Sequence, residues 1–356
     1  MTIDFAREGF RAAPTEEERV FEAARLFGQG RTGANPEAQY RLLEAFSTSD
    51  FTDLLAKAFA TQAVQAQKDA VDEFSPILYE TVVDDFKKHR LIDLWENNEF
   101  ELVREGEEYK SGSMDWTELY HSTAKHGKQF GLTYEMRRNR DFGALANFPR
   151  MLGNGSVRGQ NTAVINTLLK KDGTWAITSD VKTEALTPDT LDAALKTFAT
   201  RKDHRGDLVD TSDLVLLHGP ALTTDVYRLM NASELEFKIT SGAKVTTTRT
   251  PNPFRGRFTS LESRTLGKHL KSPTAWAIVQ GKNTTLPSLI RTKLSGEETV
   301  DIRVKRDQGA RVGGGDLPVE AGSFNDDTIW FRGRDFYGID RGFDTGVYAS
   351  SGEAAA

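Results

Sequence analysis

Three glycines are the first residues whose spacing suggests chemistry. Gly28, Gly30 and Gly33 match GxGxxG, the dinucleotide-binding fingerprint. That fingerprint follows a strand and begins a helix, so that the pyrophosphate lies on the helix N-terminus. Here the motif follows a predicted helix, and Asn35-Pro36 predicts the start of another, with Pro at the first helical position. The context is therefore wrong for a nucleotide cofactor. The GxxxxGK[ST] and GxSxG motifs are absent from the sequence.

Histidines and paired acids are the next candidates. None of the six histidines lies in HExxH, and His121 and His126 are five apart on a predicted strand, hence on opposite faces. Asp84-Asp85, Glu107-Glu108 and Asp326-Asp327 have the chemistry to bind cations, but adjacent acids on strands or turns usually face water. With no cysteine there is no thiolate nucleophile. We expect no metal, no cofactor and no enzyme activity.

Composition excludes further classes. Charged residues make up 28% and hydrophobic residues 38% of the 356 residues, and the formal charge is −6. This balance offers no basic excess for holding nucleic acid by counterion release. For the short basic clusters Arg137-Arg138 and Lys87-Lys88, the alternatives are a phosphate contact and, favoured over it, a solvated face or a subunit salt bridge. No run of about 18 apolar residues predicts a membrane span, and the N-terminus lacks a secretory h-region, so an intracellular product is expected.

The longest predicted element is a helix over 141–169. Apolar side chains recur there every three or four residues, which predicts one buried helix face. The predicted core of this helix is Phe142, Leu145, Phe148, Leu152, Val164, Ile165 and Leu168. Pro149 predicts a kink. Periodicity alone is equally compatible with two helices broken at Gly153–Gly155. Before it, alternation over 130–136 predicts a strand.

The N-terminal third divides into two parts. Residues 1–75 predict short polar helices, which form either an arm that packs on something else or a small helical domain; one helix begins near Ser49. Residues 97–121 predict a long hairpin with charges on both faces and a polar tip. The tip residues are Glu105, Glu107, Glu108, Tyr109 and Lys110. Because such a hairpin is marginal alone, it either covers its own domain or pairs with another chain.

Residues 174–350 predict a mixed α/β domain. A helix is expected from Pro188 through Phe198, and buried strands are expected at 213–217 and 275–279. A further helix follows Gly219-Pro220. A more exposed strand is expected at 300–304, a glycine-rich mobile loop at 309–322, and two closing strands at 328–332 and 335–339. Residues 351–356 predict a flexible tail.

The order of these segments resembles that of the Hong Kong 97-type major capsid proteins of tailed phages, and more closely the phage Mu-type branch. Each motif is weak, and the order and spacing are what is specific. The segments that carry the resemblance are 49–55, 105–110, 125–133, 139–144, 148–153, 186–191, 214–220 and 330–340. The match covers roughly residues 48–350. About 47 residues before it are short for a cleaved scaffold region, so no removed prodomain is expected.

The resemblance implies an α+β chain with the Hong Kong 97-type capsid fold. It implies an N-arm (1–75), a peripheral domain (76–96 and 122–173) with one kinked spine helix (141–169), an E-loop hairpin (97–121) and an axial domain (174–350). It implies a major capsid protein of the virion that self-assembles, in the host cytoplasm, as hexamers and pentamers into an icosahedral shell around double-stranded DNA. The implied partners are other copies, portal and scaffolding proteins and possible decoration proteins, with no sequence-specific DNA binding and no membrane. The alternatives are an encapsulin-like compartment with enzyme cargo and an α/β enzyme.

Overall fold

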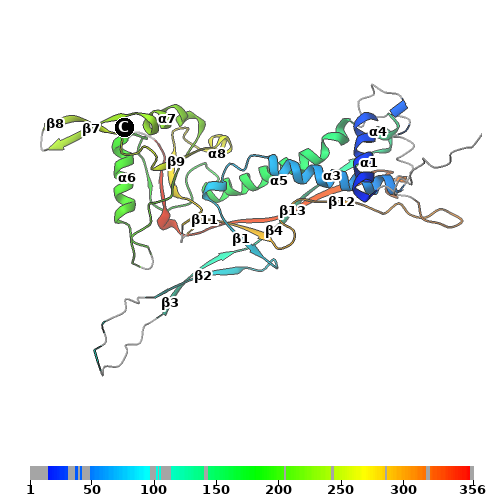
Figure 1. Ribbon diagram of the computed structural model, residues 1–356, viewed down its shortest axis with the longest axis horizontal. Helices are drawn as coiled ribbons and strands as arrows, with labels where there is room; N and C mark the ends of the chain where they lie inside the picture. Colours follow the sequence, from blue (N-terminus) through cyan, green and yellow to red (C-terminus); the bar gives the residue numbers. More distant parts are fainter. Residues whose placement is uncertain are drawn as a thin grey trace, which may run out of the picture. The chain divides into compact units, whose positions relative to one another are not determined.

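The computed structural model describes residues 15–30, 37–38, 41, 49–96, 102, 104–105, 114–139, 143–203, 206–241, 244–284, 287–317 and 321–352. The chain forms two compact units, each built from separate stretches of sequence. Unit 1 comprises 1–70, 125–157 and 299–335; unit 2 comprises 71–124, 158–298 and 336–356. One helix and one strand, α5 and β13, contribute residues to both units (Figure 1).

Unit 1 combines helices with part of a sheet. Its elements are α1 (Glu16–Gly30), α3 (Ser49–Asp69), β4 (Ala124–Leu132), α4 (Tyr134–Arg138), the first part of α5 (Gly143–Leu168), β12 (Asp301–Val304) and the first part of β13 (Ile329–Arg341). The core of unit 1 is aromatic. Phe59 of α3 packs edge-on against Phe27 and Phe331, with ring centroids 5.4 and 5.9 Å apart, and Phe130 stacks on Phe148 at 5.0 Å. The N-terminal helices therefore pack within this unit rather than only on something else.

Two strand predictions in unit 1 are wrong. Residues 134–136 were expected to extend a strand, but β4 ends at Leu132 and α4 begins at Tyr134. The physical reason is a local cap: the backbone N–H of Met136 donates to the Thr133 hydroxyl (3.2 Å), which satisfies a free donor at the start of the helix. The two closing strands predicted near the C-terminus are one continuous strand, β13.

Unit 2 holds the remaining elements. They are η1 (Ser75–Ile77), β1 (Tyr79–Val83), β2 (His89–Glu96), β3 (Met114–His121), β5 (Val181–Lys182), α6 (Pro188–Thr200), β6 (Leu214–His218), η2 (Pro220–Leu222), α7 (Thr223–Asn231), β7 (Glu234–Ser241), β8 (Lys244–Pro251), β9 (Phe258–Glu262), α8 (Arg264–His269), β10 (Trp276–Gln280), β11 (Leu289–Leu294), η4 (Asp344–Gly346) and β14 (Val347–Ser350), with the last parts of α5 and β13.

The central sheet of unit 2 has the order β5-β14-β10-β6-β9. All side chains of β6 and β10 are buried, as expected from their continuous apolar runs. Trp276 of β10 stacks on Tyr348 of β14 at 5.6 Å. The predicted helix near Pro188 is α6, and Thr187 and Thr190 form a reciprocal capping box at its start. A second group of strands pairs β1 with β11 in parallel and β11 with the end of β13 antiparallel.

The compact units divide the chain differently from the predicted domains. The expected axial domain was continuous over 174–350, but 299–335 belongs to unit 1. The reason is strand pairing: β12 pairs with β13 antiparallel, from Asp301 opposite Arg334 to Val304 opposite Phe331. Because Phe331 lies in the core of unit 1, its pairing with Val304 places β12 in unit 1 as well. The order of segments in the sequence does not indicate that the chain re-enters unit 1 at residue 299.

Candidate functional site

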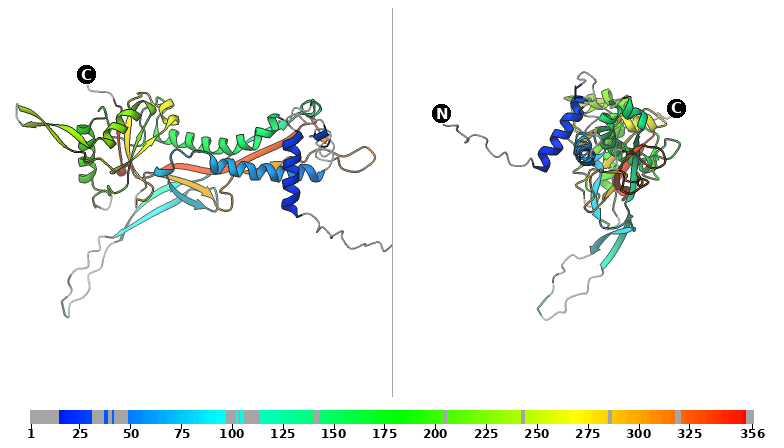
Figure 2. Two further views of the ribbon diagram at one scale, coloured as in Figure 1. Left: turned by 45° about the horizontal axis from the view of Figure 1, so that its top comes forward. Right: turned by 90° about the vertical axis from the view of Figure 1, so that its right-hand side faces the viewer.

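The candidate interaction hairpin is formed by β2 and β3 of unit 2, which extend as a two-stranded ribbon (Figure 2). His89 lies opposite His121 at its base and Glu96 opposite Met114 at the far end of the described ladder. The first strand starts earlier than predicted, at residue 89 rather than 97. His89 and Arg90 pair with His121 and Tyr120, although apolar and polar residues do not alternate clearly at the start of this strand.

The predicted tip residues lie mostly outside the described residues. Glu105 is in a turn and exposed. Glu107, Glu108, Tyr109 and Lys110 lie outside the described residues. On the described strands below the tip, an ion pair joins β2 to β3: Arg90 Nη1 lies 2.9 Å from Glu118 Oε1.

Tyr120 and Glu118 form a polar contact on the exposed side of β3. The Tyr120 hydroxyl donates to Glu118 Oε2 at 2.7 Å, while more than half of the Tyr120 side chain is exposed. This hydrogen bond lowers the pKa of the Glu118 carboxyl, with a smaller contribution from Arg90, and it raises the pKa of Tyr120. Glu118 is therefore ionised at neutral pH.

The base of the hairpin contains two histidines. His121 is buried, and its Nδ1 lies 3.0 Å from the hydroxyl of Thr292 on β11. His89 Nε2 lies 2.8 Å from Asp85 Oδ1. Burial lowers the pKa of His121, and the neighbouring His89 lowers it further. The predicted placement of His121 and His126 on one strand is wrong, since β3 ends at His121 and β4 begins at Ala124.

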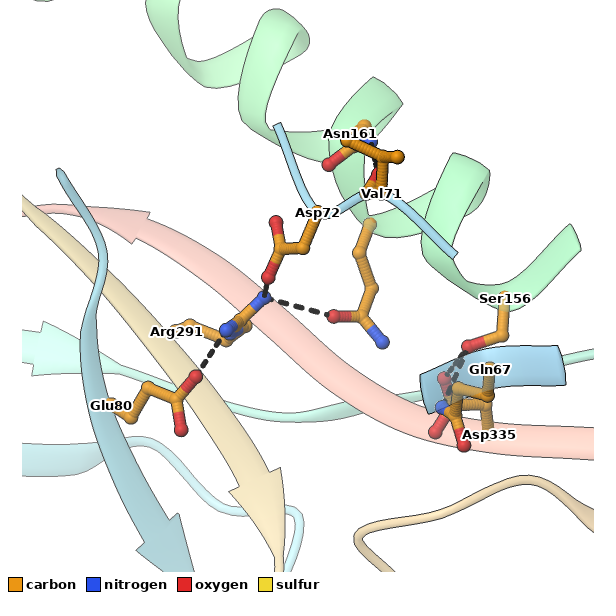
Figure 3. Close-up of polar contacts among 9 residues, drawn as sticks. Gln67, Val71, Asp72, Glu80, Ser156, Asn161, Arg291 and Asp335 are labelled. Carbon is orange, nitrogen blue, oxygen red and sulfur yellow. Dashed lines mark hydrogen bonds and ion pairs between the residues drawn. The ribbon is translucent and has the colours of Figure 1, made fainter. Parts of the chain in front are cut away.

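Arg291 of β11 is the centre of a buried ion cluster in unit 2 (Figure 3). Its guanidinium donates from Nη1 to Asp72 and from Nη2 to Glu80, and Nη1 also lies 3.3 Å from Gln160 Oε1. Only 5% of the Arg291 side chain is exposed. Burial raises the pKa of Glu80, but the hydrogen bond and charge of Arg291 outweigh this, so the pKa is lowered. The cluster ties β1, β11, α5 and the segment before η1 together.

Sequence reasoning missed the Arg291 cluster. Its partners lie 131 to 219 residues away in the chain, so no local spacing brings them together. One signal was present, because Arg291 follows Leu289 and Ile290 in an apolar run. A charged residue in a buried strand requires a partner.

A second polar cluster lies within unit 1 and contains Ser156 of α5 (Figure 3). The Ser156 hydroxyl donates to Asp335, which is buried, and accepts from Gln67 Nε2 at 3.1 Å. Gln67 Oε1 in turn accepts from the backbone N–H of Val300 at 3.0 Å. These bonds join α3, α5, β13 and the residue that precedes β12 within one unit.

The backbone of α3 lies close to Gly153 of α5. A Cβ added there would contact the carbonyl oxygen of Ala63 and would lie 2.8 Å from the backbone nitrogen of Gln67. Gly155, two residues later, has open space around it. The predicted close backbone approach over Gly153–Ser156 is therefore found at Gly153 and not at Gly155.

The predicted helix over 141–169 is one helix, α5, with Pro149 inside it. Four of its predicted core residues are buried: Phe148, Val164, Ile165 and Leu168. Leu152 is half-buried, although its methyl groups lie against Gly333. Phe142 and the side chain of Leu145 lie outside the described residues.

The chemical motifs found in the sequence form no shared site. Gly28 and Gly30 lie within α1, and Gly33 lies outside the described residues. Asp326 accepts from the Ser323 hydroxyl and the Thr328 backbone N–H, so loop groups satisfy this carboxylate. Over the described ranges, no three His, Asp or Glu side chains gather as metal ligands. Among the described helices, none is both long and apolar enough to cross a lipid bilayer.

Comparison with known proteins adds a family and a fold. The model of a family described as "Phage capsid protein" matches residues 116–350. The capsid structure of the cyanophage P-SCSP1u is similar with a TM-score of 0.51 at 10% identity, covering 79% of this chain and 88% of that one. The structure from Gordonia phage Cozz has a TM-score of 0.48 at 15% identity, and the match covers 79% of this chain and 85% of that one. The structure of a virus-like particle from Pyrococcus furiosus has a TM-score of 0.46 at 10% identity, and the match covers 83% of this chain and 98% of that one. No curated protein sequence matches the chain.

Proposed function

This chain belongs to the phage capsid protein family, and from that premise we propose that its copies form hexamers and pentamers of an icosahedral shell around double-stranded DNA. The observation that carries the proposal is the family match over residues 116–350, which covers most of the chain. The hairpin formed by β2 and β3 is a two-stranded sheet, which is marginally stable alone, and this adds a physical reason for contacts between copies.

Several predictions from the sequence are confirmed at the level of family and fold. The chain is a capsid protein of a tailed phage, a structural protein rather than an enzyme, and its place is the virion capsid. Its copies assemble into the capsid shell. The fold class is α+β of the Hong Kong 97 capsid type, as the likeness to the cyanophage capsid indicates.

Finer assignments are part of the proposal. We place the chain nearest the phage Mu-type branch because of the order of its segments. The 97–121 hairpin serves as the E-loop that lies over a neighbouring copy, and α5 serves as the spine helix. The 174–350 region supplies the axial contacts, apart from its 299–335 stretch, which belongs to unit 1. Portal and scaffolding proteins, and in some shells a decoration protein, are the further proposed partners.

Closed shells follow from the geometry of repeated contacts. A head-to-tail contact, in which one patch of a copy binds a different patch of the next, closes into a ring when the rotation allows it. The two-stranded hairpin fits such a contact, since among the described strands β2 and β3 pair only with each other. A partner copy then completes the strand surface.

Deletion of 105–113 tests the proposal. We expect the purified variant to keep its circular dichroism spectrum and yet form no shells by negative-stain microscopy and sedimentation. Replacement of the same residues by a Gly-Ser segment of equal length distinguishes the contribution of their side chains from that of the loop length. Normal shells from both variants would contradict the role of the hairpin. A chain that sediments only as a stable monomer under all conditions would contradict the shell itself.

A further inference from the structure

The turn that follows α5 contacts the end of α8 within unit 2, and Figure 1 shows α8 beside the end of α5. The backbone N–H of Lys271 donates to the carbonyl oxygen of Gly173 at 3.0 Å. Gly173 has a φ of 79°, and a Cβ added there would press on the His269 carbonyl oxygen and the Lys271 backbone nitrogen. This contact between backbones holds residues 170–174 beside residues 268–271.

Five exposed basic residues lie on the two segments that meet here. We call them the basic cluster; they are Lys170, Lys171, Arg264, Lys268 and Lys271. Within the described part of the chain, no carboxylate forms an ion pair with any of the five. The two segments, 166–174 and 262–273, contain five basic and two acidic residues, a formal charge of +3, whereas the whole chain has a formal charge of −6. The cluster is therefore a local positive patch on a negatively charged protein.

The two acidic residues of these segments bind other groups. The carboxylate of Asp172 accepts from the backbone N–H of Thr174 at 3.0 Å and from its hydroxyl at 2.6 Å. These hydrogen bonds lower the pKa of Asp172, with a smaller contribution from the charge of Lys170. Glu262 accepts from the hydroxyl of Thr223 at 2.9 Å. Neither carboxylate is ion-paired with the basic cluster, which keeps its positive excess.

Helix dipoles account for only part of this arrangement. Lys170 and Lys171 follow the C-terminal end of α5, and Lys268 lies in the last turn of α8, where the negative end of a helix favours cations. Arg264 instead lies in the first turn of α8, where the dipole disfavours a cation. It also lies four residues before Lys268, and like charges at that spacing destabilise a helix. An anionic partner would relieve both costs.

We propose that the basic cluster binds the phosphate backbone of double-stranded DNA. This inference rests on the proposed function, which places such DNA inside the shell. Lysine ammonium groups are compact charges on flexible stems, so they bind phosphates without reading the base sequence. A second protein is the competing occupant. Protein interfaces are depleted in lysine and are anchored by large apolar residues, whereas no large apolar side chain of segments 166–174 and 262–273 is exposed. These observations favour nucleic acid.

Binding of a labelled DNA duplex of about 20 base pairs to the full-length chain tests the proposal, measured by fluorescence anisotropy between about 50 and 200 mM NaCl. Lys171→Gln with Lys271→Gln removes one charge from each segment. This variant should bind at least about fivefold more weakly and lower the salt slope by about 1.8, because each neutralised phosphate contributes about 0.9. Lys125→Gln with Lys128→Gln is the matched control, since both lysines are exposed on β4 and neither forms an ion pair with a described residue. Its affinity should stay within about twofold of wild type.

A charge-preserving variant separates charge from local structure. Lys171→Arg with Lys271→Arg should keep the wild-type affinity and salt slope, and circular dichroism checks that every variant is folded. Equal affinity and slope for wild type and the Lys171→Gln, Lys271→Gln protein would overturn the proposal. If the shells of that protein also failed to form, the cluster would be assigned to a contact between proteins instead. If wild type forms no shells but its DNA binding depends on the cluster, the proposed shell fails while the DNA site stands.

Discussion

His89 and His121 lie directly opposite each other at the base of the hairpin, with their ring centroids 5.9 Å apart. One ring has a carboxylate partner, Asp85, and the other is buried against Thr292. Two imidazolium ions at this separation would repel, and burial already disfavours the charged form of His121. The base of the hairpin therefore holds one imidazole, that of His121, whose pKa is lowered by burial and by the neighbouring His89.

The first prediction concerns pH. The pKa of folded His121 lies below its unfolded value, about 6.5. Between the two values the unfolded chain binds more protons, so the free energy of unfolding falls as the pH drops below about 6.5, by about 1.4 kcal/mol for each unit of pKa difference. Urea unfolding from pH 5 to pH 8 should show this loss.

Variants separate His121 from other titrating groups. His121→Gln should flatten the pH dependence in the window below 6.5, while His126→Gln, at an exposed position of β4, should leave it unchanged. Parallel curves for wild type and His121→Gln would show that His121 does not cause the loss.

A second prediction compares two glycines of α5. Alanine normally stabilises a helix by about 1 kcal/mol relative to glycine. Gly155→Ala has open space and should show that gain. Gly153→Ala would push against the carbonyl oxygen of Ala63 and should destabilise instead. Thermal unfolding of both variants measures the sign of the change in stability. An increase in Tm for Gly153→Ala would mean that α3 and α5 are farther apart than the structure shows.

The third prediction concerns the buried face of α5. Ile165→Asp places a carboxylate in the core of unit 2, where no described cation lies among its apolar neighbours, and should prevent folding. Asn166→Asp adds the same charge at the next, exposed position and should change stability by less than about 0.5 kcal/mol. Solubility and circular dichroism distinguish them. A folded, assembling Ile165→Asp protein would show that this face is misassigned.

The fourth prediction compares a buried and an exposed arginine. Arg291→Met leaves Asp72 and Glu80 without their buried cation and should cost about 3–5 kcal/mol. Arg249→Met breaks an exposed pair with Glu236 and should cost less than about 1 kcal/mol. Urea unfolding at pH 7 measures both. Equal effects would mean that the Arg291 cluster contributes no more than a surface ion pair.

Short-range signals in the sequence identified several elements correctly. The cap at the start of α6, the apolar runs of β6 and β10, and the apolar period of α5 each act within a few residues. A cap or a helical period depends only on neighbours in the chain, so it can be read before any tertiary structure is known. The order of these elements also indicated the capsid family, which the match over 116–350 confirms.

Tertiary structure decided what depends on distant partners. The cap at Thr133 begins a helix where the sequence predicted a continuing strand. The pairing of β12 with β13 places residues 299–335 in unit 1, although the sequence predicted that they belong to the axial domain. Arg291 finds Asp72 across 219 residues, and no periodicity encodes that choice. Strand pairing and ion-pair selection are set by which surfaces the folded chain brings together, because burial makes an unpaired charge or open strand costly only once neighbours have excluded water.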